Sequence, residues 1–161
     1  MNTGTIVLLV VVALIVLIGV YIGATYNKLV KSKNSVEEAF STMDVYLKKR
    51  WDLIPNIVAS VKGYAKHEAE TLEKVISARN NGYSSMNSQQ KLEANAELNT
   101  AIKSLNVVAE QYPELKANQN FMDLDAQLKK TEEDISNARK FYNAVVKQYN
   151  NTVEMFPSSI V

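Results

Sequence analysis

Residues 5–24 read Thr5-Ile-Val-Leu-Leu-Val-Val-Val-Ala-Leu-Ile-Val-Leu-Ile-Gly-Val-Tyr-Ile-Gly-Ala24, and this stretch decides the fold. No charged side chain occurs among residues 1–27. A helix rises about 1.5 Å per residue, so about 20 apolar residues span the hydrocarbon core of a bilayer, which is about 30 Å thick. A soluble helix needs apolar residues on one face only. We therefore predict a short tail over residues 1–5 and a transmembrane anchor over residues 6–26, which includes Ile6, Leu14, Ile18, Gly19, Ile22 and Gly23.

A cleaved signal peptide and a buried core helix are the other interpretations of this run. A secretory signal has basic residues before a shorter apolar segment and small residues at its cleavage site. Here no Lys or Arg precedes the run, and the large Ile22 occupies a position where cleavage after Ala24 needs a small residue. The chain has no cysteine, which excludes a lipoprotein anchor. Gly19 and Gly23 either let a second membrane helix approach closely or reflect the ordinary glycine content of such helices.

The residues that flank the run predict its orientation. Lys28, Lys31 and Lys33 follow it, and no basic side chain precedes it. Basic residues favour the cytoplasmic side of a membrane. We therefore expect a single-pass protein of the cell membrane, with the N-terminus outside and residues 27–161 in the cytoplasm. Tyr21 and Tyr26 suit the headgroup interface at that end of the run.

The composition excludes several function classes. The chain has 18 basic and 17 acidic residues, and this balance argues against nucleic acid as a partner, because binding it needs a strongly basic surface. Without cysteine there is no thiolate catalysis and no Cys-ligated zinc. Only five glycines and three prolines interrupt the sequence, which favours long helices over a sheet.

Apolar residues at steps of three and four predict an all-α domain over residues 27–161. The first helix starts at Asn34, or continues unbroken from the anchor, and stops near Asn80-Asn81-Gly82, with a kink at Pro55. Its apolar seam runs from Val36 to Ile76. A loop over 82–87, a second helix over 88–111 and a short connection, at most one helical turn, over 114–118 follow. The third helix starts at Asn118 or Asn120. This spacing predicts an elongated antiparallel bundle of three long helices. The apolar seam of the third helix is Phe121, Leu124, Leu128, Thr131, Ile135, Ala138, Tyr142, Val145, Tyr149, Thr152 and Phe156.

No residue pattern predicts a catalytic, metal or cofactor site, and no enzyme motif occurs. The single histidine, His67, has too few neighbouring ligands for a metal and is expected on a partly exposed helix face. The carboxylates Glu132-Glu133-Asp134 are adjacent in sequence, so they do not face each other on a helix, and we expect a solvated surface with Lys129 and Lys130. Tyr142 and Tyr149 are expected in the core rather than in a ligand groove.

One cluster has two interpretations: Arg50, Trp51, Asp52, Pro55 and Asn56. The seam places Arg50 beside Trp51, and a semi-buried arginine needs a carboxylate or carbonyl partner. In the structural interpretation this partner lies inside the bundle, with Asp123 or Asp125 as candidates. In the functional interpretation the cluster contacts a protein partner or phosphate headgroups.

Several blocks of sequence, in order, resemble the LemA family. They are Asp44–Val58, Val61–Glu68, Tyr112–Phe121, Ala138–Asn143, Tyr149–Thr152 and Phe156-Pro157, preceded by Tyr26–Val30 after the anchor. The resemblance implies a bacterial or archaeal membrane protein with a short outer N-terminus and an all-helical inner domain. It implies no agreed activity and no catalytic residues. Family members usually continue past the Phe-Pro block with an apolar and aromatic tail, from which this sequence departs.

We therefore expect a non-enzymatic, membrane-anchored interaction or scaffold protein that binds the bilayer through its N-terminal helix and recruits protein partners, with self-association. One alternative is a self-assembling structural protein that shapes or organises membrane; one branch of the resembling family takes part in magnetosome formation. Another is an adaptor for a membrane-bound metalloprotease, since the family is associated with such an enzyme through neighbouring genes.

Overall fold

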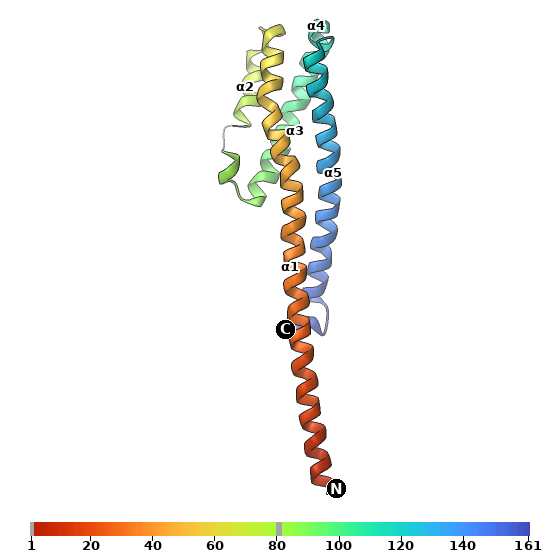
Figure 1. Cartoon of the computed structure of the whole chain (residues 1–161). Helices are drawn as coiled ribbons and strands as arrows, with labels where there is room; N and C mark the ends of the chain where they lie inside the picture. The colour runs from red at the N-terminus through yellow and green to blue at the C-terminus, as the bar shows by residue number, and fades with distance from the viewer. Residues whose placement is uncertain (1, 80–81) are drawn as a thin grey trace. The chain divides into compact units, whose positions relative to one another are not determined.

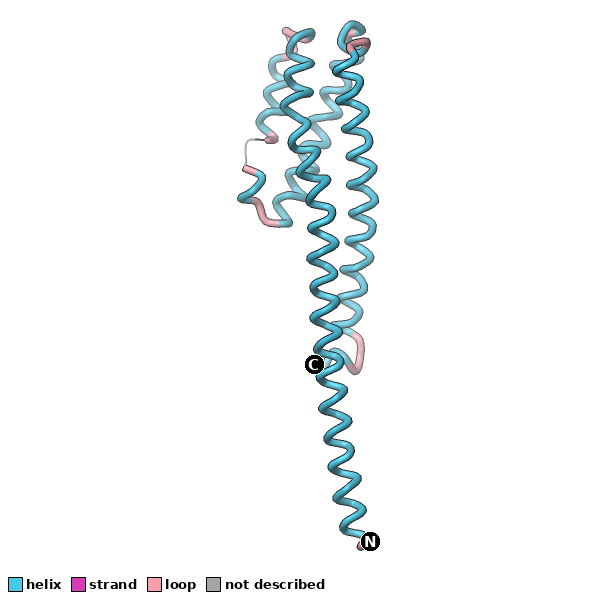
Figure 2. The backbone as a smooth tube through the Cα atoms, viewed as in Figure 1, coloured by secondary structure: helices cyan, strands magenta, loops and turns pink. Residues whose placement is uncertain are grey.

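The computed structural model describes residues 2–79 and 82–161, which form five α-helices and two short 3₁₀ helices (Figures 1 and 2). Contacts divide the chain into two compact units. The first contains the chain up to Ala39 together with Lys140–Val161, and the second is Phe40–Arg139. The long helices α1 and α5 each contribute to both units. The predicted all-α fold with a long apolar N-terminal helix is confirmed.

Helix α1 runs unbroken over Thr3–Tyr64. The alternative in which the helix continues unbroken from the apolar run is therefore confirmed. An 18-residue window of α1 has a mean hydropathy of 3.2, and none of that window is buried. This part of α1 is a candidate membrane span. No break in the helix marks the predicted anchor boundary at residue 26, so that boundary stays a prediction.

In the first unit, α1 packs against the C-terminal half of α5 (Gln119–Glu154), and the two segments run antiparallel (Figure 1). The α1 side chains that are not exposed recur every three or four residues, and so do those of α5, which is the spacing of two helices packed along a seam. On α1 they are Thr25, Leu29, Ser32, Val36 and Ala39; on α5 they are Tyr142, Val145, Val146, Tyr149 and Thr152.

In the second unit, α3 (Ser88–Gln111) coincides with the predicted second helix. The side chain of Asn87 accepts a hydrogen bond from the backbone N–H of Gln90, whose own side chain accepts one from the N–H of Asn87, a reciprocal capping box. The short connection is helix α4 (Pro113–Lys116). Asn118 caps α5, because its side-chain oxygen accepts from the N–H of Phe121 at 3.0 Å.

The predicted first helix does not continue to Asn80. It breaks after Tyr64, the chain turns through Lys66 and His67, and α2 follows over Ala69–Ser77. As a single straight helix, residues 69–77 would leave the apolar Leu72 and Val75 without a partner. The break lets α2 pack against α3, and both side chains are buried there. The predicted stop at Asn80-Asn81 lies outside the described residues, and the loop after it contains a 3₁₀ turn over Tyr83–Ser85.

Two seam positions were predicted wrongly. Ile76 is half exposed because the buried positions of α2 are Leu72 and Val75. Phe156 is 79% exposed because α5 ends at Glu154, two residues earlier than predicted. The residue before a proline disfavours the helical conformation, and Phe156 precedes Pro157. The other members of the α5 seam are buried from Phe121 to Ala138 and half-buried from Tyr142 to Thr152.

Candidate functional site

Arg50 is the largest fully buried side chain of the second unit, with 2% of its surface exposed. Its guanidinium donates to Oδ1 of Asn95 on α3 at 3.1 Å and lies 3.5 Å from Oε2 of Glu132 on α5. Burial lowers the pKa of Arg50, and the charge of Glu132 partly opposes this. Arg50 therefore links three helices. The partner is Glu132 rather than the predicted Asp123 or Asp125.

A proline inside α1 creates the next feature of the site. Pro55 has no backbone N–H, so the carbonyl of Trp51, four residues earlier, loses its helical hydrogen bond. Nε of Arg79, which follows α2, donates to this carbonyl at 3.3 Å. The Trp51 carbonyl of α1 thus binds the side chain of Arg79, which lies just after the end of α2. This explains why α1 continues through Pro55, as predicted, instead of ending there.

Tyr83 lies in the 3₁₀ turn between α2 and α3, and it joins aromatic and charged groups of two helices. Its hydroxyl donates to a carboxylate oxygen of Asp44, and its ring centroid lies 5.4 Å from that of Trp51. Nζ of Lys91 lies 2.6 Å from the other oxygen of Asp44 and 4.7 Å from the Tyr83 ring centroid, a cation–π contact. Burial raises the pKa of Tyr83, and the hydrogen bond and negative charge of Asp44 raise it further.

These groups are arranged for structure rather than for acid–base chemistry. Tyr83 keeps its proton at neutral pH and donates a hydrogen bond to Asp44, whose carboxylate is also paired with Lys91. Among the described residues, no group of three or more His, Asp or Glu side chains could hold a metal ion. His67 lies exposed in the turn between α1 and α2, not on a helix face as predicted.

The predicted cluster of residues 50–56 therefore divides into two parts. Arg50 and Trp51 are buried, whereas Asp52, Pro55 and Asn56 are exposed. Asp52 pairs with Lys48, one turn earlier on α1. The exposed Pro55 lines a groove of about 350 Å³ between α1 and α2, whose other lining residues are Ile54, Val58, Ala59, Lys62, Ile76 and Arg79. We call this feature the Pro55 groove.

The Pro55 groove is mainly apolar and carries two positive charges, on Lys62 and Arg79. Ile76 is 49% exposed there, although large aliphatic side chains of helices are usually turned inward. A surface of this kind suits a protein segment with an apolar side chain and an acidic group. The hypothesis from the sequence that the cluster of residues 50–56 contacts a protein partner stays a prediction.

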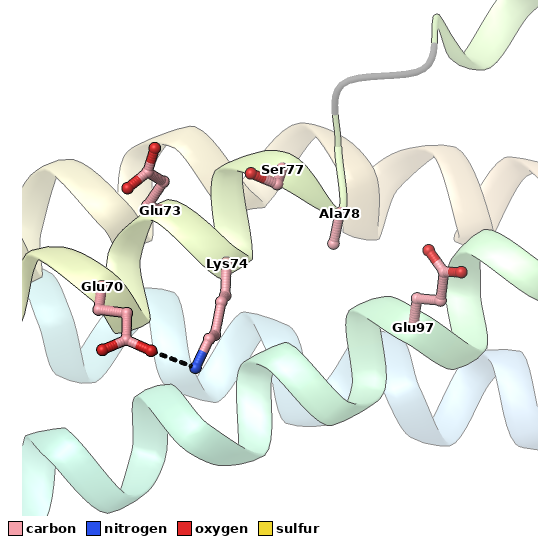
Figure 3. Close-up of a pocket in the computed structure, with 6 residues that line it drawn as sticks. All are labelled: Glu70, Glu73, Lys74, Ser77, Ala78 and Glu97. Atoms are coloured by element: carbon pink, nitrogen blue, oxygen red, sulfur yellow. Dashed lines mark hydrogen bonds and ion pairs between the residues drawn. The ribbon is translucent and has the colours of Figure 1, made fainter.

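A second surface depression lies between α2 and α3 and has a different character (Figure 3). Glu70, Glu73 and Glu97 line it together with Lys74, which pairs with Glu70 at 2.8 Å. In Figure 3, Glu73 points away from Lys74, and Glu97 lies apart on α3. The carboxylates do not converge on a common point, so this depression is a solvated acidic surface.

Sequence reasoning missed several partners in the site. Asp44, Arg79, Tyr83, Lys91 and Asn95 received no role, although all of them contact the predicted cluster or its neighbours. A signal existed for one of them: a proline within a helix frees a known carbonyl, which calls for a donor elsewhere. No sequence signal could identify Arg79 as that donor, because Arg79 reaches the Trp51 carbonyl only through the unpredicted turn after Tyr64.

The other predicted residues are placed as follows. The adjacent Glu132, Glu133 and Asp134 lie on α5 with Lys129 and Lys130 beside them; Lys130 pairs with Asp134 at 3.1 Å, and Lys129 pairs with Asp125. Tyr142 and Tyr149 are half-buried between α1 and α5. Gly19 and Gly23 lie on the exposed part of α1, as do Ile6, Leu14, Ile18 and Ile22. Lys28, Lys31 and Lys33 are exposed one to three turns further along.

The described residues thus define an all-helical chain with a candidate membrane span and a bundle whose apolar core also contains buried polar contacts. Residues 39–161 match the sequence model of the LemA family, and the chain belongs to this family. It is also 25% identical over 143 residues to the protein LemA of Metamycoplasma hominis. That match covers 88% of this chain and 65% of the relative, so the chain spans about two thirds of the length of the curated protein.

The hydrogen bond from Arg79 to the Trp51 carbonyl predicts coupling between Arg79 and Pro55. Arg79→Gln should lower the free energy of unfolding by about 1–2 kcal/mol, because it leaves a part-buried carbonyl unpaired. In a Pro55→Ala background the restored N–H of residue 55 satisfies this carbonyl, so the same change should cost much less. Urea unfolding of the detergent-solubilised chain, followed by the fluorescence of the single tryptophan, measures both costs.

The matched control for this cycle is Lys74→Gln, which removes a charge from an exposed ion pair of α2. Its effect should stay within about 0.5 kcal/mol and be the same in both backgrounds. Equal costs of Arg79→Gln with and without Pro55 would contradict the account of the freed carbonyl.

The raised pKa of Tyr83 predicts a loss of stability in alkali. Above pH about 10 the unfolded chain releases the tyrosine proton while the folded chain still holds it, so the free energy of unfolding falls as the pH rises. Tyr83→Phe removes this titration and keeps the ring against Trp51, so the alkaline fall should become shallower. Urea unfolding at pH values from about 8 to about 11, which bracket the ordinary tyrosine pKa of about 10, measures how the free energy of unfolding falls with pH. Tyr46→Phe on α1 is the control, and an unchanged slope in Tyr83→Phe would refute this role.

Proposed function

We propose that this LemA-family protein is a non-enzymatic, membrane-anchored scaffold that holds protein partners at the cytoplasmic face of the cell membrane. The observation that carries the proposal is the continuity of α1. Its first part is apolar and exposed, and the same helix continues into the helical bundle. Anchoring raises the effective concentration of a partner at the membrane without any new contact. Lys28, Lys31 and Lys33 support the orientation with the bundle inside.

We place the partner contact at the Pro55 groove. The groove combines apolar residues with the cations Lys62 and Arg79, and the hydrogen bond from Arg79 to the Trp51 carbonyl fixes one of its sides. A rigid support lets an exposed surface bind without a large ordering cost. The complementary partner is a protein segment with a bulky apolar side chain next to a carboxylate.

A second candidate function is lateral self-assembly that organises membrane. It is favoured by Gly19 and Gly23, because a Cβ built at either glycine meets nothing within 4 Å in the described chain. Two small residues four apart let helices of two copies approach closely in lipid. A third candidate is an adaptor for a membrane-bound metalloprotease, for which the Pro55 groove would be the docking surface.

Site-specific photocrosslinking tests the proposal. A benzoylphenylalanine placed at Ala59, an exposed residue of the Pro55 groove, should give discrete adducts with other proteins in cells. The matched control carries the same probe at Ala126, which is exposed on α5 outside the groove. Lys62→Glu should weaken the adducts, because it reverses one positive charge of the groove at an exposed residue. Arg79 is left unchanged, because it also binds the Trp51 carbonyl.

The outcomes separate the candidates. Adducts at Ala59 that depend on Lys62 support the scaffold, and a metalloprotease among them supports the adaptor function. Adducts only with a second copy, lost on changing Gly19 and Gly23 to Ile, support self-assembly instead. Equal labelling from Ala59 and Ala126 would contradict partner binding at the groove.

A further inference from the structure

The first unit contains a cleft that the proposed partner binding does not use. It has a volume of about 370 Å³ and lies between α1 and the C-terminal half of α5. Ala24, Asn27, Lys28, Lys31, Ser32 and Ser35 line it from α1. Val145, Gln148 and Tyr149 line it from α5. We call it the Lys28 cleft.

The cleft lies where the apolar part of α1 ends. Ala24, the last residue of the apolar run, forms one edge of its lining, and Lys28 and Lys31 follow one and two turns later. If residues 6–26 cross a bilayer, these turns lie at the level of the lipid phosphates, where Lys side chains and tyrosine hydroxyls are favourable. The position of the cleft is thus fixed by the same helix that carries the candidate membrane span.

The charge of the cleft is positive and is not compensated locally. None of its lining residues is acidic. Within the described part of the chain, neither Lys28 nor Lys31 forms an ion pair with a carboxylate, whereas their neighbour Lys33 lies 3.9 Å from Glu37. The amide groups of Asn27 and Gln148 and the hydroxyl of Tyr149 add neutral donors. Such a set of hydrogen-bond donors suits the negatively charged oxygens of a phosphate group.

The end of the chain adds apolar surface on the membrane side of the cleft. Beyond Tyr149, α5 continues antiparallel to α1 for five residues, or about 7.5 Å, in the direction of the apolar run (Figure 1). Met155, Phe156 and Ile160 follow, and each is more than half exposed. Exposed aromatic and aliphatic side chains next to a membrane span suit the boundary between headgroups and acyl chains.

We propose that the Lys28 cleft binds the headgroup phosphate of an anionic phospholipid. Lys28 and Lys31 donate to the phosphate oxygens, Tyr149 and Asn27 complete the hydrogen bonds, and the acyl chains lie along α1 beside Phe156. The proposal rests on the membrane anchor of the proposed function. It adds a preference for anionic over zwitterionic lipids, because the cation of a zwitterionic headgroup would be repelled by Lys28 and Lys31.

Photolabelling of the full chain in liposomes tests this proposal. The liposomes contain phosphatidylcholine with either photoactivatable phosphatidylglycerol or photoactivatable phosphatidylcholine as the probe. The wild-type chain should be labelled several-fold more by the anionic probe, on peptides that contain residues 24–35 or 145–149. Lys28→Gln with Lys31→Gln should remove this excess. The matched control, Lys33→Gln with Lys147→Gln, loses the same charge from the same unit outside the cleft and should keep it.

Flotation of the liposomes separates the two levels of the argument. A chain that does not float with the lipid refutes the anchor itself. A chain that floats but is labelled equally by both probes, or equally in both double variants, refutes the cleft and leaves the anchor intact. Excess inorganic phosphate should leave the labelling unchanged, and competition by it would identify a site for free phosphate rather than for lipid.

Discussion

The structure depends first on one constraint: every side chain from residue 6 to residue 24 is exposed, so no other part of the described chain covers the apolar surface of α1 there. Leaving one Leu, Ile or Val side chain in water rather than burying it costs about 1.5–3 kcal/mol. Over the whole run this exceeds the total stability of a typical domain, about 5–15 kcal/mol, so the segment needs an apolar environment. A bilayer is such an environment, and this part of α1 is a candidate membrane span. The proposed scaffold function and the proposed lipid site both depend on that span, whereas the proposed orientation rests on Lys28, Lys31 and Lys33.

The second unit is organised around polar groups that helix formation alone leaves unsatisfied. Pro55 frees the carbonyl of Trp51, and Arg79 pairs with it; the buried Arg50 needs an acceptor, and Asn95 and Glu132 provide two. Each bond joins different parts of the bundle, so the polar contacts specify which helix faces pack together. Apolar seams alone would specify this packing less strictly. The bond from Arg79 also fixes one side of the Pro55 groove, in which Pro55, Ala59 and Ile76 stay exposed.

Most helices could be predicted from the sequence, because apolar residues recur at helical spacing over many turns; α3 matched throughout, and Asn118 starts α5 by its side-chain cap. The break after Tyr64 could not, since the apolar pattern continues across it and the gain comes from packing Leu72 and Val75 on a distant helix. For the same reason Arg50 was recognised as needing a partner, but Glu132 was not identified. Local periodicity predicts which side chains are buried. The residues they meet depend on tertiary packing.

The most direct test of the central claim is the topology of the membrane anchor. The chain has no cysteine, so single Asn2→Cys and Ser84→Cys variants report on the two sides of the apolar run, and both residues are exposed. A membrane-impermeant maleimide is applied to cells before and after permeabilisation. The account predicts that Asn2→Cys is labelled in intact cells and Ser84→Cys only after permeabilisation. Labelling of Ser84→Cys in intact cells would contradict it and place the bundle, with its Pro55 groove, outside the cytoplasm.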